Sequence, residues 1–378
     1  FWVARMIMLG IENMGEPPFS HVYLHGLILD PTGLKMSKSK GNVMNPLELI
    51  DEYGADALRF AITTGVTPGN NQRIDERKIE SARNFANKIW NASRFSISKI
   101  PNNIQYDDNL GNYDLWILGK LKITTEKVNQ NLDQFNFGEA QKELYEFFWN
   151  EFCDWYIELY KSDEENNSIK NLIFVLQTSL KLLHPFLPFM TEKIWQILIE
   201  TVPSKLNEFK NEKTIINSSY PSDMNFKTAD NGIEYLITLI KSIRNLRSEL
   251  RIEHSHILKI NISDKEVFTN LSMHKKALLN LCNAELTNIK TNNNFPMVVK
   301  NNIFNIQIPK ELNFSEEINR IELEINEIKK RIIPLSKRIN SPNFYNNAPE
   351  DVINKENERL DQQNKRISQL EEILKSIK

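Results

Sequence analysis

The most constraining pattern in this 378-residue chain lies at its C-terminal end. Aliphatic residues recur there at alternating intervals of three and four positions, a spacing that gives a helix one narrow apolar seam. A break at Ser341 and Pro342 separates two such stretches, so the sequence predicts two helices that fold back as an antiparallel hairpin. Pro334 lies inside the first helix and should kink it or remove a hydrogen bond. The seam positions are Ile318, Ile321, Ile325, Ile328, Ile332, Leu335 and Ile339, then Ile353, Leu360, Ile367, Leu370, Leu374 and Ile377.

The same stretch has an uneven charge pattern. Acidic residues stop at Glu327 and resume at Glu350, and the residues between them predict a purely basic far tip for the hairpin. A basic tip on a rigid arm suits a nucleic-acid phosphate backbone. The candidate RNA-binding residues are Lys329, Lys330, Arg331, Lys337 and Arg338.

Length and composition set the outer limits. A chain of this length should form two to four domains, and we expect a cytoplasmic protein because no long apolar run or signal segment is present. The formal net charge of -2 means that any nucleic-acid partner must be held by local basic patches. Cys153 and Cys282 have no metal-ligand spacing, so we expect no bound metal. The apolar start, from Phe1 onward, resembles a domain interior, and we expect the N-terminus to have been cut away.

The first seventy or so positions predict a strand, a loop and a helix, in that order. Residues 19–29 have the apolar and aromatic runs of a buried strand, and residues 30–33 read as a turn. Asn45, Pro46 and Glu48 supply an N-cap, a first-turn proline and a capping-box acid, so a helix should begin there and end near Gly54.

After Gly69 strand signals vanish and helical periodicity dominates, which predicts a helical bundle. The proline-rich residues 183–188 predict a corner between two helices. A small mixed α/β module should follow, with a helix over 233–252 and strands near 257–262 and 304–308. Two helix faces are expected to be core, one formed by Ala82, Phe85, Ala86, Ile89, Trp90 and Ser93, the other by Phe148, Phe152, Trp155 and Leu159.

Residues 33–42, called here the lysine loop, are the stretch best suited to chemistry. Lys35, Lys38 and Lys40 alternate with small hydroxyl residues, and a glycine stands near each end. Ammonium groups neutralise polyphosphate charge, while glycines let the backbone move. As a generic basic loop this is weak evidence, because most lysine clusters on protein surfaces are simply solvated.

The order Lys35-Met36-Ser37-Lys38-Ser39 followed by Gly41-Asn42 resembles the second signature of class I aminoacyl-tRNA synthetases. His25-Gly26 upstream and Tyr53-Gly54-Ala55-Asp56-Ala57-Leu58-Arg59 downstream resemble the valyl, leucyl and isoleucyl branch. The resemblance implies ATP, with Mg²⁺ in the substrate complex, as the ligand of the loop. It assigns ATP contacts to His25, Gly26, Lys35, Met36, Ser37, Lys38 and Ser39, and the catalytic role to Lys38 and Lys35.

Within that branch the pattern leans toward the valyl enzymes, which attach valine to tRNA(Val) through valyl-adenylate. Residues 83–91 and the C-terminal hairpin carry that preference, and Trp2 falls where the family has a wall of the valine pocket, although a tryptophan in an apolar helix is usually core. The His-x-Gly-His signature and the editing insertion are absent from this sequence. We therefore expect this chain alone to be inactive. The alternatives are a leucyl or isoleucyl enzyme, or a non-catalytic tRNA-binding protein.

The expected fold is multidomain and mainly α, and the expected partners are tRNA(Val), valine and ATP, with no membrane and a monomeric state. Four parts are predicted: a Rossmann-type remnant over 1–68, a helical anticodon-binding domain over 69–229, an α/β module over 230–311 and a coiled-coil tRNA-binding arm over 312–378. Tentative contacts on the bundle are Arg73, Arg77, Arg83, Lys88 and Arg94, for which a solvated helix face is the simpler interpretation.

Overall fold

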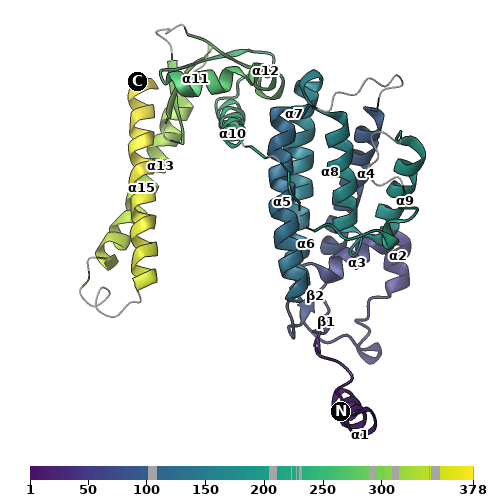
Figure 1. Ribbon diagram of the computed structural model, residues 1–378. Helices are drawn as coiled ribbons and strands as arrows, with labels where there is room; N and C mark the ends of the chain where they lie inside the picture. The colour runs from purple at the N-terminus through teal and green to yellow at the C-terminus, as the bar shows by residue number, and fades with distance from the viewer. Residues whose placement is uncertain are drawn as a thin grey trace. The chain divides into compact units, whose positions relative to one another are not determined.

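The computed structural model describes residues 1–100, 109–203, 211–222, 224–226, 228–229, 232–288, 294–300, 302–308, 315–339, 341 and 350–377. The chain divides into two compact units, Phe1–Asp230 and Asn231–Lys378. Helices predominate in both, as expected for a mainly α protein (Figure 1).

The first unit opens with the segment that carries the lysine loop. Its elements are α1 (Trp2–Met14), β1 (Ile28–Leu29), the 3-10 turn η1 (Lys38–Lys40), α2 (Pro46–Tyr53), α3 (Ala55–Thr63) and β2 (Gln72–Arg73). The strand predicted over 19–29 is wrong in extent, because only β1 forms, in parallel with β2. A strand persists only where a neighbouring strand accepts its hydrogen bonds, and β2 is just two residues long. β2 also lies beyond Gly69, where no strand was expected.

Helix α2 begins where the sequence predicts, so that prediction is confirmed. The Asn45 side chain accepts a hydrogen bond from the Leu47 amide at 3.1 Å, and Pro46 occupies the first turn. Glu48 does not complete a capping box. Its carboxylate instead accepts from the Asn45 side-chain amide at 2.8 Å, which orients the cap.

A helical bundle makes up the rest of this unit. Its helices are α4 (Glu76–Ser98), α5 (Asn112–Asp133), α6 (Phe137–Glu146), the π-helix η2 (Phe147–Tyr156), α7 (Ile157–Ser162), α8 (Ile169–Leu183) and α9 (Pro188–Thr201), with the short 3-10 turns η3 (Glu164–Asn166) and η4 (Ile215–Asn217). The predicted corner lies between the end of α8 and the start of α9. On α4 the predicted face is buried except Trp90, which is half-buried.

The second predicted face is buried on a helix of a different kind. Phe148 and Phe152 are fully buried, but they lie in a π-helical stretch that continues α6 without a break. Bulky aromatic residues crowd this stretch, with sequence Phe-Phe-Trp-Asn-Glu-Phe-Cys-Asp-Trp-Tyr. Apolar spacing alone does not distinguish an α-helix from this wider turn, so the sequence interpretation missed it.

Asp114 is the polar centre of the bundle. Its buried carboxylate accepts hydrogen bonds from the Tyr156 hydroxyl at 2.6 Å, the Ser168 amide at 2.7 Å and the Gly111 amide at 2.9 Å. The Asn171 side chain donates to it at 3.2 Å. Burial raises the pKa of this carboxyl, although each of these donors lowers it. One side chain thus ties the start of α5 to η2 and to the start of α8.

Replacing Asp114 with alanine should destabilise the bundle by about 3 kcal/mol, because three or more buried donors would lose their acceptor. Urea denaturation followed by far-UV circular dichroism measures the change. Asp133→Ala, at the exposed end of the same helix, is the matched control and should shift the free energy of unfolding by less than about 0.5 kcal/mol. Equal effects of the two substitutions would contradict the role given to Asp114.

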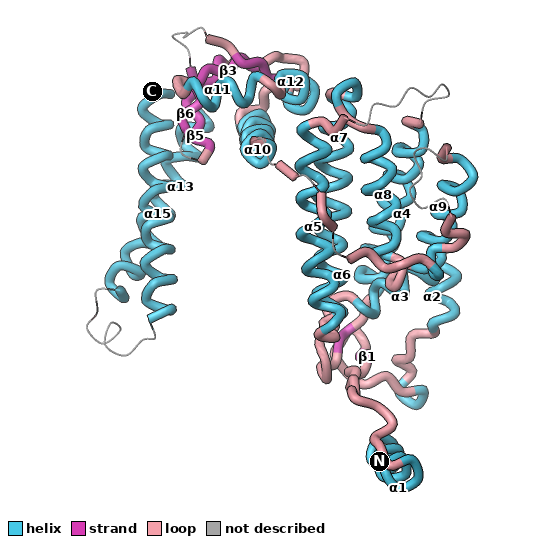
Figure 2. Tube along the Cα trace, viewed as in Figure 1, coloured by secondary structure: helices cyan, strands magenta, loops and turns pink. Residues whose placement is uncertain are grey.

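The second unit holds a mixed sheet and a helical hairpin (Figure 2). The sheet has the order β4-β3-β6-β5, in which β3 pairs with β4 in parallel and the other pairs are antiparallel. Its elements are α10 (Ile233–Glu249), β3 (Leu258–Ile262), α11 (Lys265–Ser272), α12 (Lys275–Cys282), β4 (Ala284–Leu286), β5 (Asn294–Val299) and β6 (Asn302–Gln307). The helix predicted over 233–252 ends at Glu249, and Arg251 beyond it has a φ of +50°.

The two helices of the predicted hairpin form as α13 (Ser315–Ile339) and α15 (Glu350–Ile377), and they pack together. Their shared core contains Ile321, Ile325, Ile328 and Leu370 from the predicted seam. Arg338, late in α13, pairs with Glu356, early in α15, whereas Glu324, earlier in α13, pairs with Arg366, later in α15. The two helices therefore run antiparallel. Pro334 is exposed and α13 continues through it. Pro342, in the predicted break, lies outside the described residues.

Candidate functional site

The lysine loop leaves β1 and returns to α2 through two glycines with left-handed backbone. Gly33 has a φ of +87° and Gly41 a φ of +67°, a region that other residues occupy only with strain. Lys35 forms an isolated antiparallel bridge with Leu29, which precedes the loop, and residues 38–40 make one 3-10 turn. The loop therefore has a defined backbone path.

Asp30 and Asn42 hold this path from inside. One oxygen of the buried Asp30 carboxylate accepts from the Thr32 hydroxyl at 2.7 Å and the Leu34 amide at 2.8 Å. The other oxygen accepts from the Asn42 side-chain amide at 2.7 Å. The side-chain oxygen Oδ1 of Asn42 in turn accepts a hydrogen bond from the Ser37 backbone amide at 2.9 Å. The two ends of the loop are thus joined by a side-chain bond.

These bonds lower the pKa of Asp30 from 3.8 to about 2, with the Asn42 amide as the largest cause and the Thr32 hydroxyl next. A carboxyl whose pKa falls on folding stabilises the folded form fully above its ordinary pKa. That contribution is lost as the pH falls from about 3.8 through about 2. The Asp30 carboxyl is therefore fully ionised at neutral pH.

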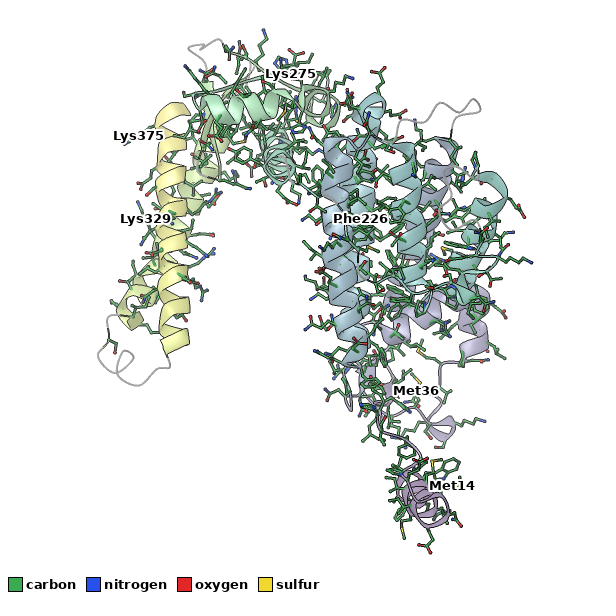
Figure 3. The ribbon with its side chains drawn as sticks, in the orientation of Figure 1. Met14, Met36, Phe226, Lys275, Lys329 and Lys375 are labelled. Carbon is green, nitrogen blue, oxygen red and sulfur yellow. The ribbon has the colours of Figure 1, made fainter. Side chains whose placement is uncertain are left out.

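The three lysines of the loop point to solvent. Lys35, Lys38 and Lys40 are exposed, and within the described residues none of their ammonium groups has an ion pair or a hydrogen bond. The Ser37 and Ser39 hydroxyls bond each other at 2.7 Å, and Met36, labelled in Figure 3, is half-buried. The loop thus presents uncompensated positive charge from an ordered backbone.

His25 and Gly26 line a cavity of about 430 Å³ that none of residues 35–39 lines. The cavity lies between the segment before the lysine loop and the bundle, with Phe137 and Phe186 among its apolar walls. The His25 ring nitrogen Nδ1 bonds the Gly26 carbonyl at 2.9 Å. The structure therefore separates these two predicted ATP contacts from the loop lysines, and their role stays a prediction.

Trp2 is 76% exposed, and no residue of α1 is buried. It does not lie against the lysine loop among the described contacts. Its assignment to a valine pocket stays a prediction.

Sequence reasoning missed the roles of two residues near the loop, Asp30 and Arg73, and it had placed Arg73 among the tentative contacts on the bundle. Asp30 was seen only as part of a turn, yet it organises the loop. Arg73 on β2 lies so close to Gly33 that a Cβ there would meet its guanidinium at 2.8 Å. The pairing of Leu29 with Arg73 brings this cation to the loop, and a pairing across that distance in sequence leaves no local signal.

The predicted purely basic tip is wrong in one respect, because acids of the hairpin compensate three of the five residues. Lys329 pairs with Glu371 at 2.9 Å, Arg331 with Glu327 at 3.1 Å and Arg338 with Glu356 at 3.4 Å (Figure 3 labels Lys329). The antiparallel partner helix supplies two of these acids, which a reading of one helix overlooks. Lys330 and Lys337 make no ion pair within the described hairpin and are exposed.

Two of the tentative contacts on the bundle are also engaged within the protein. Lys88 pairs with Asp154 at 2.8 Å and lies over the Trp149 ring. Arg83 lies over the Tyr53 ring and 3.8 Å from Glu80. Arg94 is different, since it is exposed at a groove of about 550 Å³ between α4 and α9 that Trp90 and Phe95 also line.

Two kinds of feature are absent from the part of the chain that the structure describes. No helix is long and apolar enough to cross a membrane. Within the same residues, no group of three or more His, Cys, Asp or Glu side chains could hold a metal ion.

Three family models match the chain. Residues 1–75 match tRNA synthetases class I (I, L, M and V), residues 114–262 the anticodon-binding domain of tRNA ligase, and residues 313–378 the valyl tRNA synthetase tRNA binding arm. The first match contains the lysine loop, with Asp30 and Asn42. These matches define a class I aminoacyl-tRNA synthetase.

Proteins similar to this chain in sequence indicate which family within this class it belongs to. Valine–tRNA ligase from Dehalococcoides mccartyi (strain CBDB1) is 44% identical over 298 residues, which cover 76% of this chain and 33% of that protein. Valine–tRNA ligase from Staphylococcus aureus (strain MRSA252) is 39% identical over 344 residues, 85% of this chain and 38% of that protein. The chain thus spans about a third of the length of these relatives. It belongs to the valyl-tRNA synthetase family, as a C-terminal part.

Solved structures show more distant similarity. A leucyl-tRNA synthetase complex with tRNA from Agrobacterium radiobacter K84 has a TM-score of 0.43 and 20% identity, covering 65% of this chain and 33% of that one. Methionyl-tRNA synthetase from Mycobacterium tuberculosis with methionyl-adenylate has a TM-score of 0.39 and 19% identity, covering 53% and 42%.

The Asp30 carboxyl should titrate near pH 2, because its donors favour the ionised form. Carbon-detected NMR of the side-chain carboxyl measures this directly. Asn42→Ala should raise the pKa toward 3.8, since it removes the largest of the lowering contacts. An Asp30 pKa near 3.8 in the unsubstituted chain would contradict the hydrogen-bond pattern of the loop.

Proposed function

We propose that this chain supplies the lysine-loop half of the ATP site and the tRNA-binding parts of an enzyme that attaches valine to tRNA(Val). The observation that carries the proposal is the lysine loop, an ordered backbone that presents Lys35 and Lys38 without a protein partner among the described residues. The family membership of the chain gives that loop a substrate.

The chemistry fits the loop. When a carboxylate attacks the α-phosphate of ATP, the bond to pyrophosphate breaks and negative charge moves onto the leaving group. Positioned ammonium groups stabilise that charge most when their contacts tighten in the transition state. Lys38 is proposed as the principal contact and Lys35 as the second, with Met36, Ser37 and Ser39 shaping the site and His25-Gly26 near the adenine.

A loop of this kind needs the other half of a nucleotide site. We propose that residues 1–68 are the C-terminal remnant of a Rossmann-type catalytic domain, in which Trp2 lines the valine pocket. Exposure of the apolar residues of α1 and of Leu24 and Leu27 supports this, because such surface is normally covered. On this proposal the chain alone does not activate valine.

The remaining parts are proposed to hold tRNA. Residues 69–229 would bind the anticodon, and the groove beside Arg94 and Phe95 supports this because it combines a cation with an aromatic wall on which a base can stack. Residues 312–378 would form the arm that contacts the tRNA backbone. Residues 230–311 form the module at its base, where Arg320 of α13 lies 3.4 Å from Glu249 of α10.

The ion pairs of the hairpin are weak enough for an RNA phosphate to compete with them. Exposed pairs such as Lys329 with Glu371 stabilise a protein by only about 0 to 1 kcal/mol. A phosphate that approaches can therefore compete for the cation at small cost. Lys330 and Lys337, which have no such pair within the described hairpin, are the stronger proposed contacts.

Lys38→Ala should lower the rate of valine-dependent pyrophosphate exchange about a hundredfold in an enzyme completed by the N-terminal half, because a transition-state contact is lost. Lys40→Ala is the matched control, since this lysine is also exposed in the same turn and carries no proposed contact. Equal rates for the two variants would contradict the proposal. So would exchange by this chain without the other half.

For the arm, the paired change Lys330→Ala with Lys337→Ala should weaken tRNA(Val) binding and reduce the slope of log affinity against log salt by about two. Lys329→Ala with Arg331→Ala, whose cations have carboxylate partners, should change the slope less. Filter binding across a salt series measures both. Removal of residues 312–378 with no change in affinity or slope would eliminate the arm from the mechanism.

A further inference from the structure

The lysine loop is closed at its neck by a bond that none of the roles proposed above uses. Asp30 stands before the first left-handed glycine of the loop and Asn42 directly after the second, and their side chains meet at 2.7 Å. This pair is called here the neck clasp. All the described hydrogen bonds of both side chains stay within residues 30–42.

We propose that the neck clasp is a positioning device that sets where Lys35 and Lys38 meet the triphosphate. Neither Asp30 nor Asn42 carries an ammonium or a hydroxyl group, so neither is proposed as a contact of the triphosphate. Asn42 instead fixes the backbone at two points, accepting from the Ser37 amide and donating to the Lys35 carbonyl at 3.3 Å. Those points adjoin the two lysines, so a shift of the clasp moves both. The inference rests on the proposed function of the loop.

The geometry assigns distinct tasks to the two side chains. Asp30 fixes the first turn of the loop through Thr32 and Leu34, and its second oxygen remains for Asn42. An ionised acceptor makes a hydrogen bond roughly twice as strong as a neutral one. Between the clasp and the lysines, Gly33 and Gly41 allow backbone rotation. The clasp therefore limits a loop that would otherwise be free to swing.

Two single substitutions should open the clasp in different ways. Asp30→Asn places a side-chain amide against the Asn42 amide, so two donors face each other. Asn42→Asp places two carboxylates about 3 Å apart, which cannot both be ionised without repulsion. Each variant keeps nearly the same shape and volume as the native residue.

The reciprocal exchange Asp30→Asn with Asn42→Asp should close the clasp again. The new amide at position 30 can still accept from Thr32 and Leu34 through its oxygen, and it donates to the new carboxylate at position 42. The other oxygen of that carboxylate accepts from the Ser37 amide. The 3.3 Å bond to the Lys35 carbonyl is lost, and a carboxylate oxygen takes the place of the donor nitrogen that faced this carbonyl.

Loop order is measured on this chain without ATP. Hydrogen exchange at the Ser37 amide and tryptic cleavage after Lys35, Lys38 and Lys40 should each accelerate about tenfold in the single variants, if the lost bond contributes about 1.4 kcal/mol. The double exchange should return both rates to within about threefold of the native chain. Helical circular dichroism should be unchanged in all variants, since the clasp has no hydrogen bond to the bundle among the described residues. A double variant as loose as the singles, or singles as ordered as the native chain, would overturn the clasp.

Pyrophosphate exchange in the completed enzyme then tests positioning. The single variants should lower kcat by about tenfold with a smaller change in the KM for ATP, because a misplaced lysine loses contacts made in the transition state, and the double exchange should restore kcat. If kcat is unchanged in the singles while Lys38→Ala is slow, the positioning role is wrong and the lysine role stands. If Lys38→Ala is also unaffected, the proposed function of the loop itself fails.

Discussion

The contact between the rings of Phe60 on α3 and Phe85 on α4, 4.9 Å between centroids, is the point on which the first unit depends. Phe85 is fully buried and also contacts Tyr145 and Phe148 across the bundle. Removing a buried phenylalanine of this kind costs about 3 to 5 kcal/mol. Because α3 follows α2, and α2 follows the lysine loop, this apolar contact also anchors the lysine loop to the bundle.

Hydrogen bonds also fix the position of α3 against the start of α9 and the corner before it. The buried Asp56 carboxylate accepts from the Met190 amide at 2.6 Å and the Phe189 amide at 3.3 Å, so a side chain of α3 caps α9. Arg59 donates to the Pro185 carbonyl at 3.2 Å. Apolar packing alone would let two helices slide past each other, whereas these hydrogen bonds form only in one position of α3 relative to α9. The loop-bearing segment and the helices proposed to bind tRNA are therefore held in one register by these bonds.

The spacing of apolar residues in the sequence predicted those features of the fold that depend only on residues close together in the chain. The sequence predicted three such features: the start of α2 with Asn45 as its N-cap, the core face of α4, and the seam residues of α13 and α15. Each follows from residues within a few helical turns. The extent of β1, the π-helix around Phe152 and the acid partners of Lys329 and Arg338 were not predicted. Each depends on a partner distant in sequence, or on a choice between two helical turns. The loop motif indicated the candidate site, but not the part played by Asp30, whose side chain bonds Asn42 across the neck of the loop.

The most direct test is binding of this chain to matched valine, isoleucine and leucine tRNA transcripts across a salt series. We expect a clear preference for the valine transcript that persists as salt rises, because shape and base contacts are less salt-dependent than phosphate contacts. Equal binding to all three, falling steeply and together with salt, would contradict it. The helices and the arm would then form only a general RNA-binding surface.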